Sequence, residues 1–141
     1  MPTNIDLKGL RVAVTGGTSG LGLALVRLLA GRGVCVAFVA RTAETVKHIA
    51  DETGAFGIVG DIGHKDGIYP IATQITGNLG GLDALINNAS ALGPTPLAPL
   101  ADTECEELEQ ALQVNLVGPF RLTKALFGAL TATRVEVGAG P

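Results

Sequence analysis

Short apolar runs along this chain alternate with longer stretches in which apolar residues recur at helical spacing. The runs at residues 10–14, 34–40, 56–59 and 82–86 predict strands, and glycine or polar residues follow soon after each of them. The helical positions between them are Leu21, Leu25, Leu28 and Leu29, then Val46, Ile49 and Ala50, then Ile68, Ala72, Ile75 and Leu79. Repeated strand–helix units predict an α/β fold, namely a Rossmann-like, doubly wound parallel sheet with helices on both faces.

The predicted sheet is incomplete, with about four strands and the stub of a fifth. Val135 and Val137 could begin that fifth strand, but Gly-Ala-Gly-Pro follows at once, so residues 131–141 are expected to form an irregular tail. Residues 1–141 form a single domain on this interpretation. Sheets of this order place the first and fourth strands centrally, so the strand at 82–86 would expose an apolar edge. We therefore expect marginal stability for the chain alone unless it forms a homo-oligomer.

A second helical pattern follows the fourth predicted strand. Residues 93–99 contain three prolines and are expected to form a loop. Asp102 or Thr103 is expected to cap the next helix. A kink is expected at Gly118-Pro119, because proline removes a helical hydrogen bond. The leucines at helical spacing are Leu108, Leu112, Leu116, Leu122, Leu126 and Leu130.

Composition and charge argue against several classes of function. With 47% hydrophobic and 16% charged residues, the chain is expected to be globular and not disordered. A net charge of −3 without basic clusters argues against a nucleic-acid partner, and no apolar run is long enough to cross a membrane. Cys35 and Cys105 are expected to be unpaired, and His48 and His64 lack metal-ligand spacing. We expect no metal site and a cytoplasmic protein.

The glycine-rich segment at residues 15–22 is the main candidate for chemistry. Its candidate ligand contacts are Gly16, Gly17, Thr18, Ser19, Gly20, Leu21 and Gly22. Gly16 and Gly20 lack a Cβ, so the main chain can approach a pyrophosphate there, and Gly22 lets the helix pack closely on the strand. The N–H groups and positive dipole end of the helix then face the phosphates. The alternative is a tight turn without a ligand, but the position after the first strand favours dinucleotide binding.

Residues at the ends of the other predicted strands indicate the same ligand. These candidate contacts are Arg41, Thr42, Asp61, Ile62, Asn88 and Ala89. Arg41 stands where an acidic residue would hold the ribose 2′-hydroxyl of NAD, so it favours the 2′-phosphate of NADP. Asp61 could accept a hydrogen bond from an adenine amino group, and Asn88 would lie beside the ribose. The structural alternatives are a solvated arginine, a turn aspartate and an asparagine that satisfies loop backbone.

Together these motifs resemble the short-chain dehydrogenase/reductase superfamily over nearly the whole chain. The resemblance rests on the order and spacing of Lys8-Gly9, the loop at 15–22, Asp61-Ile62, Asn87-Asn88-Ala89 and Val114-Asn115-Leu116. Ser90 is a departure, because the family usually has glycine there. The resemblance implies an NAD(P)-dependent oxidoreductase that transfers hydride between the nicotinamide and a carbonyl or alcohol substrate. It also implies that Asn115 holds a water in a proton relay; the alternative is an asparagine that satisfies the backbone of a kinked helix.

The rest of the catalytic set that the resemblance implies is not found in the sequence. That set is a serine and a Tyr-x-x-x-Lys pair, which should follow the fifth strand. The single tyrosine, Tyr69, has Thr73 and not lysine four residues later, and no serine follows Ser90. Lys124 has no tyrosine partner at the matching spacing. We therefore expect this chain to carry the cofactor-binding half and to be inactive alone.

Two other interpretations stay open. The chain could be a non-catalytic dinucleotide-binding or interaction module, or a truncated gene product. The identity of the small carbonyl or alcohol substrate is not encoded in these residues, because such folds recognise it mostly with segments after the fifth and sixth strands.

Overall fold

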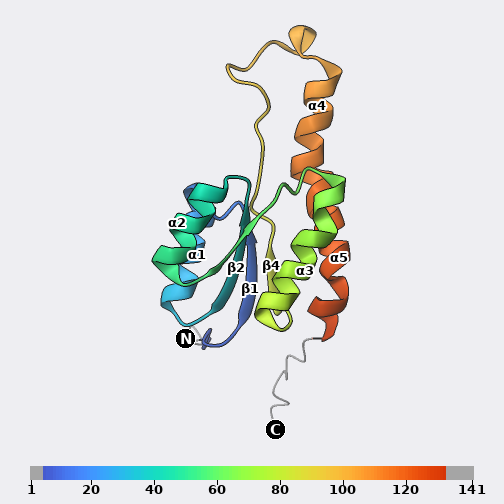
Figure 1. Cartoon of the computed structure of the whole chain (residues 1–141). Coiled ribbons are helices and arrows are strands. Elements are labelled where there is room, and N and C mark those ends of the chain that lie inside the picture. Colours follow the sequence, from blue (N-terminus) through green and yellow to red (C-terminus); the bar gives the residue numbers. More distant parts are fainter. Residues whose placement is uncertain (1–4, 133–141) are drawn as a thin grey trace.

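Among the residues that the structure describes, four parallel strands form one sheet, with β1 (Arg11–Thr15) between β2 (Cys35–Ala40) and β4 (Ala84–Ile86) (Figure 1). The computed structural model describes residues 5–132. The remaining strand is β3 (Phe56–Val59), and the spatial order of the four is β3-β2-β1-β4. Every neighbouring pair is parallel. The predicted α/β fold with a Rossmann-like sheet is therefore confirmed.

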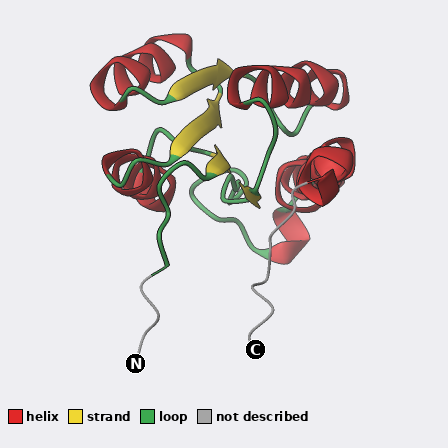
Figure 2. Cartoon of the chain, turned by 90° about the horizontal axis from the view of Figure 1, so that it is seen from below, coloured by secondary structure: helices red, strands yellow, loops and turns green. Residues whose placement is uncertain are grey.

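Helices cover both faces of this sheet, so the molecule has three layers (Figure 2). The helices are α1 (Gly20–Gly31), α2 (Ala43–Thr53), α3 (Ile68–Leu79), α4 (Cys105–Leu112) and α5 (Gly118–Ala132). Short 3₁₀ turns occupy Lys65–Gly67 and Leu100–Asp102, and a π-helical segment, Gln113–Val117, joins α4 to α5. The parallel strands need such crossovers, and the helices that form them bury both faces of the sheet.

Alternating side chains of the central strands supply two separate cores. On β1, Val12 and Val14 pack with α1 and α2, whereas Ala13 faces the opposite side. On that side Ile75 of α3 and Leu122 of α5 are completely buried. Both faces of β1 are thus covered, which explains why its sequence is a continuous apolar run and not an alternating one.

The leucine pattern predicted after the fourth strand divides into a buried half and an exposed half. Leu122 and Leu126 of α5 belong to the core, whereas Leu108 and Leu116 are exposed. Figure 1 shows the reason: α5 lies beside the sheet, but α4 extends past the end of the strands. Helical spacing predicted the stripe, and the position of the sheet decides which part of it is buried.

The predicted cap of the fourth helix is wrong. Neither Asp102 nor Thr103 caps α4, because the N-cap is Glu104. Glu104 and Glu107 form a reciprocal capping box, in which the Glu104 backbone N–H donates to Glu107 Oε2 at 3.1 Å. Asp102 ends the preceding 3₁₀ turn, and the Thr103 hydroxyl donates to the Pro99 carbonyl. A local turn therefore uses both residues before the helix begins.

The irregularity predicted at Gly118-Pro119 lies one turn earlier, in the π-helical segment Gln113–Val117. Pro119 has no N–H to donate to the carbonyl of Asn115, four residues before it. The N–H of Gly118, one residue before Pro119, donates to the carbonyl of Gln113, five residues earlier, which is π-helical bonding. Gly118 then approaches the chain after β3 so closely that a Cβ there would overlap the Ile62 carbonyl oxygen.

The fourth strand is shorter than predicted and forms one edge of the sheet in the part of the chain that is described. Its three residues, Ala84–Ile86, are half-buried. Val135 and Val137, the predicted start of a fifth strand, lie outside the described residues, as does most of the predicted irregular tail. The expected marginal stability of the chain alone stays a prediction.

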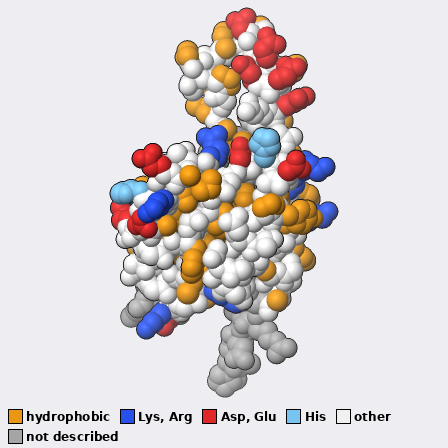
Figure 3. Space-filling model, in the orientation of Figure 1, with side chains coloured by type: hydrophobic (Ala, Val, Ile, Leu, Met, Phe, Trp, Pro, Cys, Tyr) orange, Lys and Arg blue, Asp and Glu red, His pale blue; other side chains and the backbone are white. Residues whose placement is uncertain are grey.

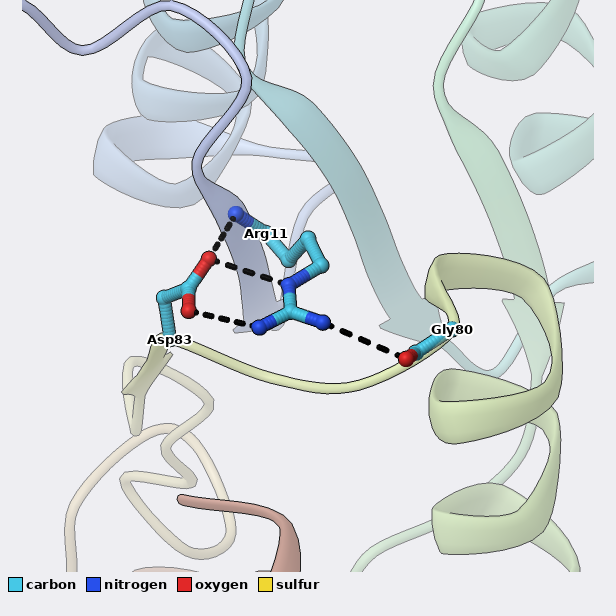
Figure 4. Close-up of polar contacts among 3 residues, drawn as sticks. All are labelled: Arg11, Gly80 and Asp83. Atoms are coloured by element: carbon cyan, nitrogen blue, oxygen red, sulfur yellow. Dashed lines mark hydrogen bonds and ion pairs between the residues drawn. The ribbon is translucent and has the colours of Figure 1, made fainter. Parts of the chain in front are cut away.

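An ion pair fastens β4 to β1 at the amino ends of the two strands (Figure 4). Asp83 accepts hydrogen bonds from the Arg11 backbone N–H at 2.7 Å, from Nε at 3.1 Å and from one terminal guanidinium nitrogen at 2.9 Å. The other terminal nitrogen donates to the Gly80 carbonyl at 3.2 Å. The hydrogen bond to Asp83 raises the pKa of Arg11 above its ordinary value. This pairing supports the backbone register of β4 against β1.

We expect Asp83→Asn to lower the melting temperature by about 5 °C, because it weakens the partly buried pairing with Arg11 that joins β4 to β1. The matched control is Asp51→Asn, which removes an exposed pair with Lys47 within helix α2. That control should change the melting temperature by about 1 °C or less, since exposed pairs contribute little. Circular dichroism melting curves measure both. Equal shifts for the two variants would contradict the role assigned to Asp83.

Candidate functional site

A cleft of about 450 Å³ lies at the carboxyl ends of the four strands. The chain segments after β1, β2, β3 and β4 all contribute to its wall, and Val114 of the π-helical segment completes it. The predicted cofactor contacts that line it are Gly16, Thr18, Ser19, Gly20, Leu21, Arg41, Thr42, Asp61, Ile62, Asn88 and Ala89. The topology thus brings together residues that lie far apart in the sequence.

Two of the predicted contacts lie behind the cleft wall. A Cβ on Gly17 would stand 2.6 Å from the Cβ of Phe38, so Gly17 packs against β2. A Cβ on Gly22 would overlap the Gly16 carbonyl oxygen and would lie 2.5 Å from Asn88 Nδ2. Gly22 therefore lets α1 lie close to the residue that follows β1. Side chains at these two positions would collide with their neighbours, so both glycines are needed for the packing of the turn.

The amino end of α1 is open toward the cleft. Ser19 occupies the N-cap, but its side chain makes no capping hydrogen bond, and no acidic residue lies in the first turn. The first helical bond runs from the Leu23 N–H to the Ser19 carbonyl. The N–H groups of the first turn therefore have no helical partner, and they add to the positive end of the helix dipole. Such an end favours an anion.

Gly20 leaves room at this helix end. Its φ is +52°, and no atom lies within 4 Å of the position that a Cβ would take. Because Gly20 lines the cleft, a side chain there would occupy space that a ligand could use. We call this open space beside the Gly20 backbone the cradle. A Cβ on residue 20 would fill it, and a phosphate group fits there beside the N–H groups of the helix end.

The end of β4 is bonded to the glycine segment through a buried threonine. Thr15 is fully buried, and its hydroxyl accepts the N–H groups of Asn88 and Ala89, each at 3.1 Å. Asn88 Nδ2 in turn donates to the carbonyls of Thr15 at 3.1 Å and Gly16 at 3.2 Å. Asn88 thus satisfies loop backbone, which was its structural alternative, while it also lines the cleft.

Asn115 fixes the chain that follows. Its Oδ1 accepts the Ala91 N–H, and its Nδ2 donates to the Ala91 carbonyl, both at 2.7 Å. The side chain therefore satisfies the backbone of the loop after β4 and not that of its own helix. Asn115 itself does not line the cleft, although its neighbour Val114 does. Its participation in a proton relay stays a prediction.

Helix α4 and the loop before it extend past the ends of the strands (Figure 1). Charged side chains gather where this segment meets the rest of the molecule (Figure 3). Arg41 lines the cleft, is exposed, and its guanidinium makes no ion pair or hydrogen bond within residues 5–132. Thr42 occupies the N-cap of α2 without a side-chain capping bond. Asp61 Oδ1 accepts the Gly63 N–H at 2.9 Å, so this carboxylate serves the turn that was its alternative role. Because the Arg41 guanidinium has no partner among residues 5–132, it can bind an anion in the cleft.

The sequence interpretation did not assign several cleft residues to the site. These are Val39, Ala40, Gly60, Ser90, Ala91 and Val114. Ala40, Gly60 and Ser90 each adjoin a predicted contact, so the strand ends could have indicated them. Val114 comes from a different part of the chain, and only the packing of the π-helical segment brings it to the cleft.

Other kinds of site are not found in the described part of the chain. Cys35 and Cys105 are free and exposed. No group of His, Cys, Asp or Glu side chains within residues 5–132 has a metal-binding arrangement. Among the same residues, no helix has the length and apolar character needed to span a membrane.

Comparison with known proteins identifies the family of this chain. The sequence matches the family model described as short chain dehydrogenase over residues 11–138. The chain belongs to the short-chain dehydrogenase family. A short chain dehydrogenase from Pseudocercospora fijiensis is 36% identical over 133 residues, which are 89% of this chain and 42% of that protein.

Solved short-chain dehydrogenase structures share the fold. One from Burkholderia cenocepacia, in complex with NADP, superposes with a TM-score of 0.80 at 27% identity and covers 89% of this chain. A metagenomic short-chain oxidoreductase, also in complex with NADP, has a TM-score of 0.80 at 32% identity and covers 91%. The chain spans 53% and 59% of the lengths of these two structures.

We expect Gly20→Ala to weaken NADPH binding by about tenfold or more, because the added Cβ occupies the cradle at the helix end. The matched control is Gly54→Ala at the carboxyl end of α2, where φ is +75° and no atom lies within 4 Å of a Cβ. Both substitutions carry a similar backbone cost of about 1–2 kcal/mol. Of these two glycines, Gly20 lines the cleft and Gly54 does not.

Fluorescence titration with NADPH measures the affinity, and urea unfolding measures the stability of each variant. A similar loss of affinity in Gly54→Ala would show that backbone strain and not the cradle governs binding.

Proposed function

We propose that this cleft binds NADP(H), and that the chain is the cofactor-binding part of a short-chain dehydrogenase that acts on a carbonyl or alcohol substrate. One observation carries the proposal: the uncapped amino end of α1 and the unpaired guanidinium of Arg41 line the same cleft. An anionic ligand with phosphates at two separated positions matches that pair of features. The solved relatives that contain NADP support the same ligand.

Each wall of the cleft would hold a different part of the dinucleotide. The N–H groups at the start of α1 would bind the pyrophosphate, for which Gly16 and Gly20 leave the backbone accessible. Arg41, together with the Thr42 hydroxyl, would bind the 2′-phosphate that distinguishes NADP from NAD. Asp61 and Ile62 would border the adenine. Asn88 and Ala89 would lie beside the ribose on the side of β4.

When bound, the dinucleotide supplies the hydride that the family's reaction exchanges with substrate. The residues of this chain bind and orient it, and Asn115 holds the loop after β4 through Ala91. We further propose that Asn115 contributes to a proton relay, as the family resemblance implies. A water at that position would be oriented by the π-helical segment, in which carbonyl groups are displaced from regular helical bonding.

We expect Arg41→Gln to weaken NADPH binding by about tenfold or more and to leave NADH binding nearly unchanged, since charge-assisted hydrogen bonds to the 2′-phosphate are lost. The matched control is Arg32→Gln, which removes an exposed cation at the carboxyl end of α1, away from the cleft. Titrations at two salt concentrations separate direct contact from the general field. Equal affinity of the unsubstituted chain for NADPH and NADH would refute the role proposed for Arg41.

The 141 residues taken alone are proposed to bind the coenzyme without turnover. They contain no Tyr-x-x-x-Lys pair, and general acid–base assistance contributes roughly 10²–10⁴ in rate. Purified chain should therefore show NADPH binding but no measurable oxidation of NADPH with a panel of aldehydes and ketones. Turnover at ordinary rates would contradict this expectation.

A further inference from the structure

We propose that the Ser90 hydroxyl donates a hydrogen bond to the ribose beyond the pyrophosphate, that is, to the nucleoside opposite the one bound near Arg41. This inference rests on the proposed function and deepens it, because it assigns a residue to the second half of the dinucleotide. Three features of the described structure carry it: a fixed backbone, a free donor and a position across the sheet from Arg41.

The backbone of Ser90 is fixed by its two neighbours. On one side, the Ala89 N–H donates to the buried Thr15 hydroxyl at 3.1 Å. On the other side, both polar backbone groups of Ala91 bond to the Asn115 amide at 2.7 Å. Ser90 therefore stands between two anchors that come from β1 and from the π-helical segment. A ligand that binds the hydroxyl therefore does not have to order this part of the backbone.

The Ser90 side chain is the free side-chain donor on this wall. Ser90 is exposed and lines the cleft, and its hydroxyl has no hydrogen bond within residues 5–132. Asn88 lines the same wall, but its Nδ2 group already donates to the carbonyls of Thr15 and Gly16. The other residues of this wall, Ala89 and Ala91, have no polar side-chain atoms.

The order of the strands places Ser90 across the cleft from Arg41. Strand β1 lies between β2 and β4, so the glycine segment that follows β1 lies between Arg41, after β2, and Ser90, after β4. A dinucleotide with its 2′-phosphate at Arg41 and its pyrophosphate at the start of α1 must extend toward β4. The next group beyond the pyrophosphate is a ribose, whose hydroxyl oxygens accept hydrogen bonds.

Three ligands of increasing length test the assignment by calorimetric titration of the full 141-residue chain. The first, 2′,5′-ADP, ends at the 5′-phosphate; the second, 2′-phospho-ADP-ribose, adds the pyrophosphate link and the second ribose; NADPH adds the nicotinamide. We expect Ser90→Ala to weaken binding of the second and third ligands about fivefold and to leave 2′,5′-ADP unchanged. Ser90→Thr, which keeps the hydroxyl, should bind all three as the unsubstituted chain does.

Each outcome has a distinct meaning. Unchanged NADPH affinity in Ser90→Ala, or an equal loss for all three ligands, would overturn the inference about Ser90 and leave the proposed function standing. A loss confined to NADPH would place the contact on the nicotinamide and would also overturn it. If the unsubstituted chain is folded by circular dichroism yet binds none of the three ligands, the proposed function fails, and the inference fails with it.

Discussion

The hydrogen bonds of the buried Thr15 hydroxyl are the interaction on which the cleft depends. This oxygen has no contact with solvent, and it accepts two backbone N–H groups of the chain that leaves β4. Asn88 returns two bonds to the backbone of Thr15 and Gly16. Because buried polar groups are costly to leave unpaired, this network holds two strand ends at one fixed separation. The glycine segment and the wall that contains Ser90 therefore have a defined geometry.

The rest of the architecture supports this junction from both ends of the strands. The Arg11–Asp83 pair fixes β4 against β1 at their amino ends, and the Thr15–Asn88 network fixes them at their carboxyl ends. An edge strand of only three residues contributes few ladder bonds. Side-chain bonds at its two ends add to the backbone pairing with β1 that sets its register. Asn115 extends the same support to Ala91, one residue beyond Ser90.

Much of this was predictable from the sequence because the relevant signals are local or periodic. The apolar runs predicted all four strands, and their carboxyl ends gave most of the cleft wall, since parallel strands meet at one edge. The failures are equally local in origin. Asp102 and Thr103 suit an N-cap by residue type, but the preceding turn uses them, and the Glu104–Glu107 box begins the helix instead.

The sequence by itself determined the fold class and the glycine segment, because these depend on residue type and spacing along the chain. Tertiary structure alone decided which of these residues line the cleft and which pack against other segments. Gly17 packs against Phe38 while its neighbour Thr18 lines the cleft. Val114 reaches the cleft, and Asn115, one residue later, bonds to Ala91 instead. The direction of a side chain depends on contacts with distant segments, and no local pattern encodes those.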